Sequence, residues 1–504
     1  MYRKYKLILK GDNMSKGSKY KKNWKKSDIY FVLVYLILTV LTMIQLFTVN
    51  VFPMKYMLAI AIILILLFLG MYGLQMGKRI NKINKILGKI LIVILSVFLV
   101  FGNWILFKTG SAFSKITGVD SEVSVVSIVV MKDSGYDSIS DLNGKKIGTI
   151  TLGDQEIQQK AMKDLENDLG NHLTTVSYVS YKDFADDLYN GNVDAIVLNE
   201  GARGMFEDNH PSFDNDTKVL ESYTYKSETK DLSKDVDVTK EPFNIYITGI
   251  DTYGSLATVS RSDVNMIVSV NPKNNQILIT GIPRDYYIPQ TCQNGQTDKL
   301  THTGMYGVEC TLQSVENYMG IDINYYARVN FSSVVDIVDA LGGITLDSPY
   351  SFITRHGGYY ITQGYNELNG AQTLGFVRER YSLPNGDVDR SKNQMLVVEA
   401  MIKKAISPSI ITNYGSIMNA ISGSFQTNMK ESDITSFIRK QVNDMNGWDI
   451  KQIQVTGQSS SQWSPANGFN SSVMIPDELS VEKAVGLMSK IISGELITVE
   501  DINY

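Results

Sequence analysis

Residues 243–285 read FNIYITGIDTYGSLATVSRSDVNMIVSVNPKNNQILITGIPRD, and three β-rich segments stand out within them. They cover residues 243–250, 264–270 and 276–280. The second segment alternates like a half-buried strand, and the NPKNN sequence that follows it predicts a turn into the third. If the three strands are neighbours, each runs antiparallel to the next. The end of the first, the start of the second and the end of the third then share one edge of a sheet.

Charged residues gather at that predicted edge. Asp251 follows the first strand, Arg261 and Asp263 precede the second, and Arg284 and Asp285 follow the third. Carboxylates from two strands that meet beside arginines would suit Mg²⁺, with a phosphate bridging the metal and a guanidinium group. Structural ion pairs are the alternative interpretation of the same pattern.

A second charged stretch, residues 376–394, reads FVRERYSLPNGDVDRSKNQ. A helix with Asn369 as its N-cap is predicted to end at Arg378 and Arg380, before a turn at residues 384–386. Arg390 and Gln394 are four residues apart and share one face at the start of the next helix. Guanidinium groups near a helix N-terminus favour phosphate binding. The alternative is a solvated loop in which the arginines pair with nearby acids, which are Glu379, Asp387 and Asp389.

The charge of the chain is distributed unevenly. Residues 1–108 hold 17 Lys and Arg against 2 Asp and Glu, whereas residues 109–504 hold 31 against 50. A basic head on an acidic body argues against general nucleic-acid binding by the body and suggests a membrane boundary between the two. The two cysteines, Cys292 and Cys310, are compatible with either a disulfide or free thiols. The four histidines have no metal-ligand spacing, which disfavours a zinc site.

Three apolar runs follow a basic arm at residues 1–28. They span residues 29–49, 56–74 and 90–107, are essentially free of charge, and are long enough to be transmembrane helices. Lysines and arginines concentrate in the arm and in the second loop, so the positive-inside rule places the N-terminus in the cytoplasm. The chain is therefore predicted to be a multi-pass protein of the cell membrane, with everything beyond the third span outside the cell.

Residues 118–225 alternate between strand and helix patterns, which predicts a small α/β domain with a mainly parallel sheet. The sequences ISDLNGKKIG at 139–148 and YNGNVDAIVLN at 189–199 resemble segments of periplasmic solute-binding proteins, over about one lobe. One lobe lacks the second wall of a closing cleft, so a scaffolding or docking role is as good a hypothesis as ligand capture. Residues 222–242 are polar and aperiodic, and within them 226–240 are interpreted as a linker.

The second half of the chain carries a set of short motifs in a defined order. They are GID at 249–251, RSD at 261–263, GIPRD at 281–285, DKLTH at 298–302, VRER at 377–380 and DRSKNQ at 389–394. In this combination the sequence resembles the LytR-CpsA-Psr (LCP) family, and most of all its streptococcal capsule proteins. The resemblance covers about residues 241–495, leaves 496–504 as a tail, and implies an α/β/α sandwich with a central mixed sheet.

The resemblance also implies a function. Family members are phosphotransferases of the Gram-positive envelope, which attach a glycopolymer carried on undecaprenyl pyrophosphate to peptidoglycan through a phosphodiester. Capsular polysaccharide and wall teichoic acid are both possible polymers. The implied cofactor is Mg²⁺, with Mn²⁺ as a substitute. The implied partners are the lipid-linked donor, the peptidoglycan acceptor, membrane lipids and other envelope-assembly proteins, and nucleic acid is not expected.

Site residues follow from the matched motifs. Asp251 and Asp263 would hold the metal, and Asp387 would lie close to the arginines. The pyrophosphate would be bound by Arg261, Arg284, Arg378, Arg380, Arg390 and Gln394. An apolar tunnel for the polyprenyl tail would be lined by Val334, Val335, Ile337, Val338, Leu341, Met395, Val398 and Ile402, for which plain core packing is the alternative.

Two other classes of function remain open from the sequence. One is a membrane-bound transcriptional attenuator, for which the basic arm and the loop at 75–89 are the predicted cytosolic material. The other is a non-catalytic scaffold that binds polyprenyl phosphates. The general base of the transfer is also open: Asp263, Asp387 and His302 are candidates, although a structural role is the better interpretation of His302.

Overall fold

The fold is described from a computed structural model of the chain. The structure describes residues 25–503 except 79, 118–120, 207–208, 229, 251–257, 408–416, 418–419 and 421–423. The chain forms two compact units, which we describe separately. One comprises the N-terminal helices to residue 107, and the other comprises residues 51–53 and 108–504.

The N-terminal unit consists of three apolar helices, α1 (Lys26–Val49), α2 (Met54–Met76) and α3 (Lys82–Thr117). Each is long and apolar enough to cross a membrane, as the sequence predicts. Helix α3 begins eight residues before the predicted span, because the basic residues ahead of the apolar run are also helical. Polar contacts join the helices: the Asn103 amide donates to the Thr42 hydroxyl at 2.8 Å, and Lys89 Nζ lies 2.7 Å from Asp28.

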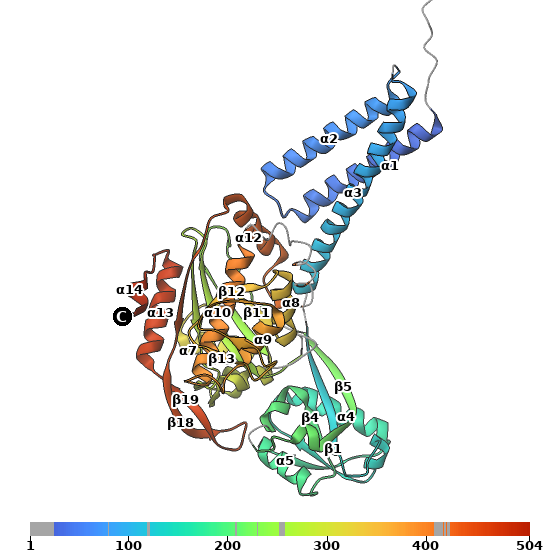
Figure 1. Ribbon diagram of the computed structural model, residues 1–504. Coiled ribbons are helices and arrows are strands. Elements are labelled where there is room, and N and C mark those ends of the chain that lie inside the picture. The colour runs from blue at the N-terminus through green and yellow to red at the C-terminus, as the bar shows by residue number, and fades with distance from the viewer. Residues whose placement is uncertain are drawn as a thin grey trace, which may run out of the picture. The chain divides into compact units, whose positions relative to one another are not determined.

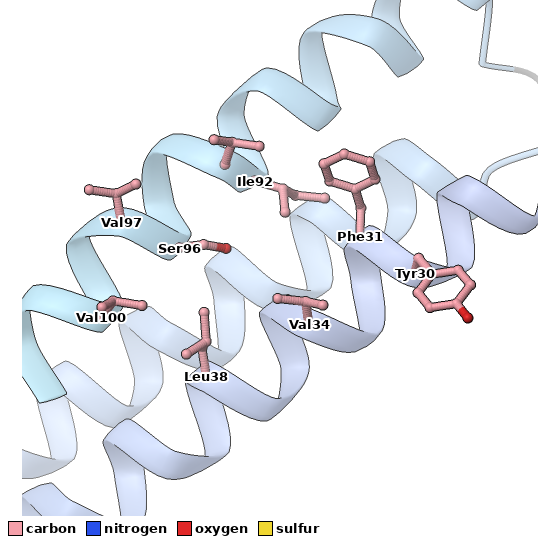
Figure 2. Close-up of a pocket in the computed structure, with 9 residues that line it drawn as sticks. Tyr30, Phe31, Val34, Leu38, Ile92, Ser96, Val97 and Val100 are labelled. Carbon is pink, nitrogen blue, oxygen red and sulfur yellow. The ribbon is translucent and has the colours of Figure 1, made fainter.

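A groove of about 450 Å³ opens between α1 and α3. Figure 2 shows that Phe31, Val34 and Leu38 of α1 and Ile92 and Val97 of α3 contribute apolar side chains to it. If these helices span a membrane, this apolar lining suits contact with lipid acyl chains.

Residues 121–228, which we call the accessory lobe, form an α/β domain around a five-stranded sheet. The sheet order is β3-β2-β4-β1-β5. The strands are β1 (Ser121–Met131), β2 (Lys146–Ile150), β3 (Thr174–Tyr178), β4 (Ala195–Asn199) and β5 (Thr217–Glu228). The helices are η1 (Ile139–Leu142), α4 (Gln155–Leu169), α5 (Tyr181–Tyr189), η2 (Glu200–Phe206) and α6 (Phe213–Asp216).

Two expectations for this lobe are wrong. The sheet is not mainly parallel: β2 is parallel to β3 and β4, but β1 is antiparallel to both β4 and β5. Residues 226–228 of the expected linker are not linker, because they form the end of β5, which pairs with β1 over its whole length. The strand escapes sequence recognition because it is an edge strand whose residues are mostly polar and largely exposed.

Residues 230–503, the large domain, are built on a six-stranded mixed sheet in the order β16-β11-β6-β7-β8-β17. In Figure 1 this domain is coloured from green through yellow to red. The three strands predicted from residues 243–285 are its centre: β6 (Phe243–Ile250), β7 (Ser262–Asn271) and β8 (Gln276–Gly281). They are antiparallel neighbours, as expected. Strand β11 (Tyr325–Val329) pairs in parallel with β6, and β17 (Asp449–Gln454) in parallel with β8, while β16 (Gln426–Thr427) closes one edge.

Helices cover both faces of this sheet, which makes the domain an α/β/α sandwich. On one face α7 (Val308–Met319) and α13 (Glu478–Ser493) pack over Tyr246, Ile267 and Leu278. On the other face α10 (Asp387–Ala405) and α12 (Glu431–Asp444) pack over alternate residues such as Met266 and Ile279. Helix α10 approaches β8 so closely that a Cβ on Gly281 would lie 2.7 Å from the sulfur of Met395.

The remaining elements of the large domain are short or peripheral. They are β9 (Tyr287–Pro289), η3 (Thr291–Gln293), β10 (Thr297–Lys299), η4 (Leu300–Tyr306), α8 (Phe331–Ala340), β12 (Ile344–Ser348), β13 (Phe352–Ile353), β14 (Tyr360–Ile361), β15 (Gly364–Leu368), α9 (Gly370–Arg378), β18 (Gly457–Ser464), β19 (Phe469–Pro476) and α14 (Val499–Asn503). Helix α9 begins at the predicted cap: the Asn369 side chain accepts from the backbone N–H of Gln372 at 2.9 Å.

Cys292 and Cys310 form a disulfide that ties η3 to α7. We expect the double variant Cys292→Ser/Cys310→Ser to lose about 2–4 kcal/mol of unfolding free energy, because the bond limits the freedom of the unfolded chain. Urea unfolding of the full chain in detergent measures the loss. A reducing agent should shift the wild-type midpoint and leave that of the double variant unchanged; equal midpoints of both oxidised proteins would contradict the prediction.

Candidate functional site

The predicted sheet edge brings charged residues of distant segments together. Asp263 lies at the start of β7, and Arg284 follows β8. The guanidinium of Arg284 donates to Asp263 Oδ1 at 3.0 Å. The Arg261 guanidinium lies 4.0 Å from Asp263 Oδ2. The up-down-up order of the strands thus places two arginines around one carboxylate.

Helix α10 adds its first turn to this cluster. Asp387 is its first residue and contacts Arg390, one turn further along the helix. The Nε of Arg284 lies 3.7 Å from Asp387 Oδ1, which links the sheet edge to the helix. Arg284 Nε also lies 3.9 Å from Asp285. We call Arg261, Arg284, Arg390, Asp263 and Asp387 the charged cluster.

The electrostatics of the charged cluster keep its carboxylate ionised. Burial alone would raise the pKa of Asp263, but Arg284, Arg261 and Arg390 outweigh burial and lower it well below its usual range. Burial would likewise lower the pKa of Arg284, yet Asp263, Asp285 and Asp387 raise it. Burial and the neighbouring Arg284 lower the pKa of Arg390. The cluster is therefore a set of mutually dependent charges rather than independent surface groups.

Two polar atoms of the charged cluster lack a hydrogen-bond partner. They are Arg284 Nε and Asp387 Oδ1, both buried. Asp387 Oδ1 contacts guanidinium groups, but not in hydrogen-bond geometry. Buried polar atoms in folded proteins are nearly always hydrogen-bonded. An unsatisfied donor of this kind, among several arginines, is the arrangement expected where an anionic ligand supplies the acceptor.

The other predicted pyrophosphate ligands lie at the end of α9 and on α10. Arg380 is close enough to Arg390 to help lower its pKa, so it borders the charged cluster. Arg378 stacks over the Phe331 ring, with its guanidinium carbon 4.0 Å from the ring centre. The Gln394 amide donates to the carbonyl of Val377 at 3.3 Å, which fixes α10 against α9.

Glu379 and Asp389 serve the backbone of this segment. Glu379 accepts hydrogen bonds from the backbone N–H groups of Arg355, Arg380 and Ser382. Burial would raise the pKa of Glu379, but these backbone donors lower it. Asp389 accepts from the Asn385 N–H at 3.0 Å. These acids shape the turn that carries Arg380 toward α10.

Thr301 is a contact of Asp263 that the sequence interpretation did not single out. Its hydroxyl donates to Asp263 Oδ1 at 2.8 Å. A signal was present, because Thr301 lies within the DKLTH motif at 298–302. His302 of the same motif is buried, with Nδ1 3.1 Å from Asp298. Asp298 also accepts from the Ser464 hydroxyl and the Ala466 N–H, so His302 lies in a structural network.

The predicted metal ligands are only partly described. Asp251 lies outside the described residues, whereas Asp263 is placed in the charged cluster. Within the described part of the chain, no three or more His, Cys, Asp or Glu side chains gather as a metal site. Asp263 nonetheless offers an ionised carboxylate, the oxygen ligand type that Mg²⁺ prefers.

The predicted tunnel residues lie on two helices. On α8, Val338 is buried, and Val334, Val335 and Ile337 are half-buried, while Leu341, directly after the helix, is buried. On α10, Met395 is buried in the core above the sheet, and Val398 and Ile402 pack against the same core. For these three α10 residues the structure shows the packing contacts of an ordinary core. Their role toward a prenyl chain stays a prediction.

Two family models match the chain, and they meet between residues 211 and 212, within the accessory lobe. The family model described as the LytR_cpsA_psr family matches residues 212–489, more than half of the sequence. The chain belongs to the LytR-CpsA-Psr family. A second model, described as NMT1/THI5 like, matches residues 116–211, which comprise most of the accessory lobe.

Named relatives of the LytR-CpsA-Psr family share about a third of the aligned residues. The polyisoprenyl-teichoic acid–peptidoglycan teichoic acid transferase TagU of Enterococcus faecalis is 34% identical over 215 residues, which are 42% of this chain and 70% of TagU. TagU of Bacillus mycoides is 33% identical over 231 residues, 46% of this chain and 72% of TagU. Among solved structures, B. subtilis TagV is 26% identical with a TM-score of 0.43, over 50% of this chain and 98% of TagV.

Proposed function

We propose that this LytR-CpsA-Psr protein is a membrane-anchored transferase that moves a glycopolymer from a polyprenyl diphosphate carrier to peptidoglycan. The two TagU relatives are named as polyisoprenyl-teichoic acid–peptidoglycan teichoic acid transferases. The observation that carries the proposal is the charged cluster, in which Arg261, Arg284 and Arg390 surround Asp263 and Asp387 at one edge of the sheet. The polymer is a capsular polysaccharide or a wall teichoic acid.

The charged cluster suits a diphosphate. A diphosphate diester brings about two negative charges, and attack on phosphorus spreads charge over the equatorial oxygens. Positive groups that are placed before the reaction stabilise this charge without reorganisation. The buried Nε of Arg284, which has no hydrogen-bond partner, offers one donor within the charged cluster. Arg380, Arg378 and Gln394 extend the donor set along α9 and α10.

The transfer exchanges one bond to phosphorus for another. A sugar hydroxyl oxygen of peptidoglycan bonds to the phosphorus that carries the glycan, and the bond from that phosphorus to the bridging oxygen breaks. Polyprenyl phosphate leaves with the electron pair, and the hydroxyl proton passes to solvent. Asp263 is a poor acceptor for this proton, since its neighbours hold its pKa well below the usual range.

We propose that Asp263, together with Asp251, holds Mg²⁺, with Mn²⁺ as a substitute. Asp263 fits this role because it is ionised and no hydrogen bond to its Oδ2 is among the described contacts, whereas Oδ1 accepts from Arg284 and Thr301. A bound divalent ion would neutralise charge on the transferred phosphoryl group.

Removal of divalent ions with EDTA should lower transfer on the order of a hundredfold, because the lost charge stabilisation is worth several kcal/mol. Mg²⁺ should restore the rate, Mn²⁺ should do so at least in part, and Ca²⁺ serves as the comparison ion. The assay follows radiolabelled glycan from the lipid carrier into peptidoglycan. Full transfer in the presence of EDTA would contradict the metal assignment.

The same assay distinguishes a transferase from a non-catalytic scaffold that binds polyprenyl phosphates. A scaffold would bind the polyprenyl diphosphate without releasing polyprenyl phosphate.

Three apolar helices are consistent with anchoring at the membrane, where such a donor resides. We infer that the N-terminus is cytoplasmic and that the accessory lobe and the large domain face outward, from the basic residues of the arm and the second loop. The anchor then raises the local concentration of the lipid donor.

A further inference from the structure

A polar pocket of about 280 Å³ lies between the accessory lobe and the large domain. The lobe contributes residues of η2, His210, Pro211 and the first two residues of α6, and the large domain contributes residues 258–261. The side chains used below are Glu200, Arg203, Phe206, Phe213, Asp214 and Arg261. Sites for drug-sized ligands have volumes of about 300 Å³ or more. This pocket is slightly smaller, so it suits a ligand of about one sugar ring.

Arg261 connects this pocket to the charged cluster. Its guanidinium donates to the carbonyl of Gly204 in η2 at 3.1 Å, and it lies 4.0 Å from Asp263 on the other side. The contact is close: a Cβ on Gly204 would lie 2.6 Å from the guanidinium carbon. A ligand in the pocket is therefore separated from Asp263 by a single arginine side chain.

The charges of the pocket balance one another. Arg203 pairs with Glu200 at 2.5 Å and with Asp214 at 3.0 Å, and Arg261 faces the carbonyl of Gly204. The pocket holds two acids and two arginines, and His210, which also lines it, is paired with Asp186 at 2.8 Å. These charges give no net attraction for an anion, unlike the neighbouring charged cluster. Carboxylates, guanidinium groups and backbone carbonyls instead offer both acceptors and donors to a neutral ligand.

Two aromatic rings lie beneath the ion pairs of the pocket. The rings of Phe206 and Phe213 are 4.2 Å apart and belong to the buried core of the lobe, where neither is more than 3% exposed. They support η2 and α6, while the ion pairs and backbone groups form the surface that a ligand meets. A sugar ring carries a rim of hydroxyl and amide groups, which matches such a mixture of donors and acceptors.

We propose that the pocket binds a sugar ring of the peptidoglycan acceptor, so that the accessory lobe forms the acceptor side of the transfer site. This inference rests on the proposed function, because it assumes that the charged cluster holds the donor. The acceptor hydroxyl would then reach the phosphorus past Arg261. The lobe lacks the second wall of a solute-binding protein, and here the large domain supplies that wall.

Asp214→Ala tests the site in the full chain. The Asp214 side chain is exposed, so its loss should leave the fold intact, while a hydrogen bond to a charged group is removed from the ligand. With a soluble disaccharide-peptide from peptidoglycan as acceptor, we expect the acceptor KM to rise about tenfold and the donor KM to stay unchanged. The dissociation constant of the same fragment, measured by calorimetry without donor, should rise equally.

Asp137→Ala is the matched control, because Asp137 is also an exposed acid of the accessory lobe with a basic partner, Lys218, at 2.8 Å. It should keep wild-type values. An Asp214→Ala variant with wild-type acceptor KM and fragment binding would overturn the acceptor site and leave the transferase standing. Fragment binding that depends on Asp214 in a protein without transfer activity would support the site and overturn the proposed function. A wild-type chain that neither binds the fragment nor transfers would overturn both.

Discussion

Arg284→Ala is expected to lower the rate of glycopolymer transfer by about 10³–10⁵-fold, the range found for arginines that stabilise phosphoryl transfer. Arg284 contacts three carboxylates: it donates to Asp263 at 3.0 Å and lies within 4 Å of both Asp285 and Asp387. These acids raise its pKa, so it is charged at every working pH. The assay is the incorporation of labelled glycan into peptidoglycan at saturating donor.

Stability must be separated from catalysis in this variant, because removing one partner of buried charges is itself costly. Arg284→Lys keeps the positive charge and the pairing with Asp263 but loses the planar fork that binds phosphate oxygens in pairs. We expect it to unfold near the wild-type midpoint and still transfer slowly. Arg439→Ala, on α12, is the control outside the charged cluster and should transfer normally. Wild-type transfer by Arg284→Ala would refute the assignment of the site.

The centre of the large domain could be predicted because local sequence decides it. Strands β6, β7 and β8 follow one another with a short turn between the last two, so their order and direction fix which residues share an edge. That edge correctly joins Arg261, Asp263 and Arg284. The sequence also places Arg390 and Gln394 on one helix face and expects Asp387 near the arginines, but it does not show that the first turn of α10 meets Arg284.

Elements that depend on distant partners were harder to predict. Strand β11 enters the sheet beside β6 from about eighty residues away, and β17 joins β8 across an even longer stretch of chain. Their positions are set by parallel pairing, which leaves no hairpin signal in the sequence. The polar strand β5 is similar: its pairing with β1, rather than its own composition, makes it a strand. Only the folded chain shows these contacts.

The position of the accessory lobe is the largest feature that local patterns do not reveal. The N–H of Val259 donates to the carbonyl of Val123 at 3.0 Å, and Met305 and Ala466 of the large domain are buried in the core of the lobe. Solute-binding resemblance alone suggests a separate module, whereas these contacts make the lobe a packed neighbour of residues 258–261. A packed lobe is a requirement of the acceptor site proposed above.

One buried ion pair is central to this packing, and Glu122→Ala should destabilise the chain by about 3–5 kcal/mol. Glu122 of β1 lies 2.9 Å from Arg328 of β11, which is 1% exposed, and it accepts the N–H of Val308 at 3.1 Å. Without Glu122, the positive charge of Arg328 loses a buried partner and the first turn of α7 loses an acceptor. Urea unfolding of the full chain in detergent, followed by tryptophan fluorescence, measures the loss.

The pair can be distinguished from an ordinary salt bridge by a double-variant cycle. Glu122→Leu/Arg328→Met removes both charges and should cost much less than the two single losses together, because no unpaired charge remains buried. Glu309→Ala breaks an exposed pair with Lys230 at 3.0 Å and should cost at most about 1 kcal/mol. A Glu122→Ala chain as stable as Glu309→Ala would show that the lobe is not held by this pair. If the pair does hold the lobe, Glu122→Ala should also raise the acceptor KM, because Gly204 and its contact with Arg261 would shift with the lobe.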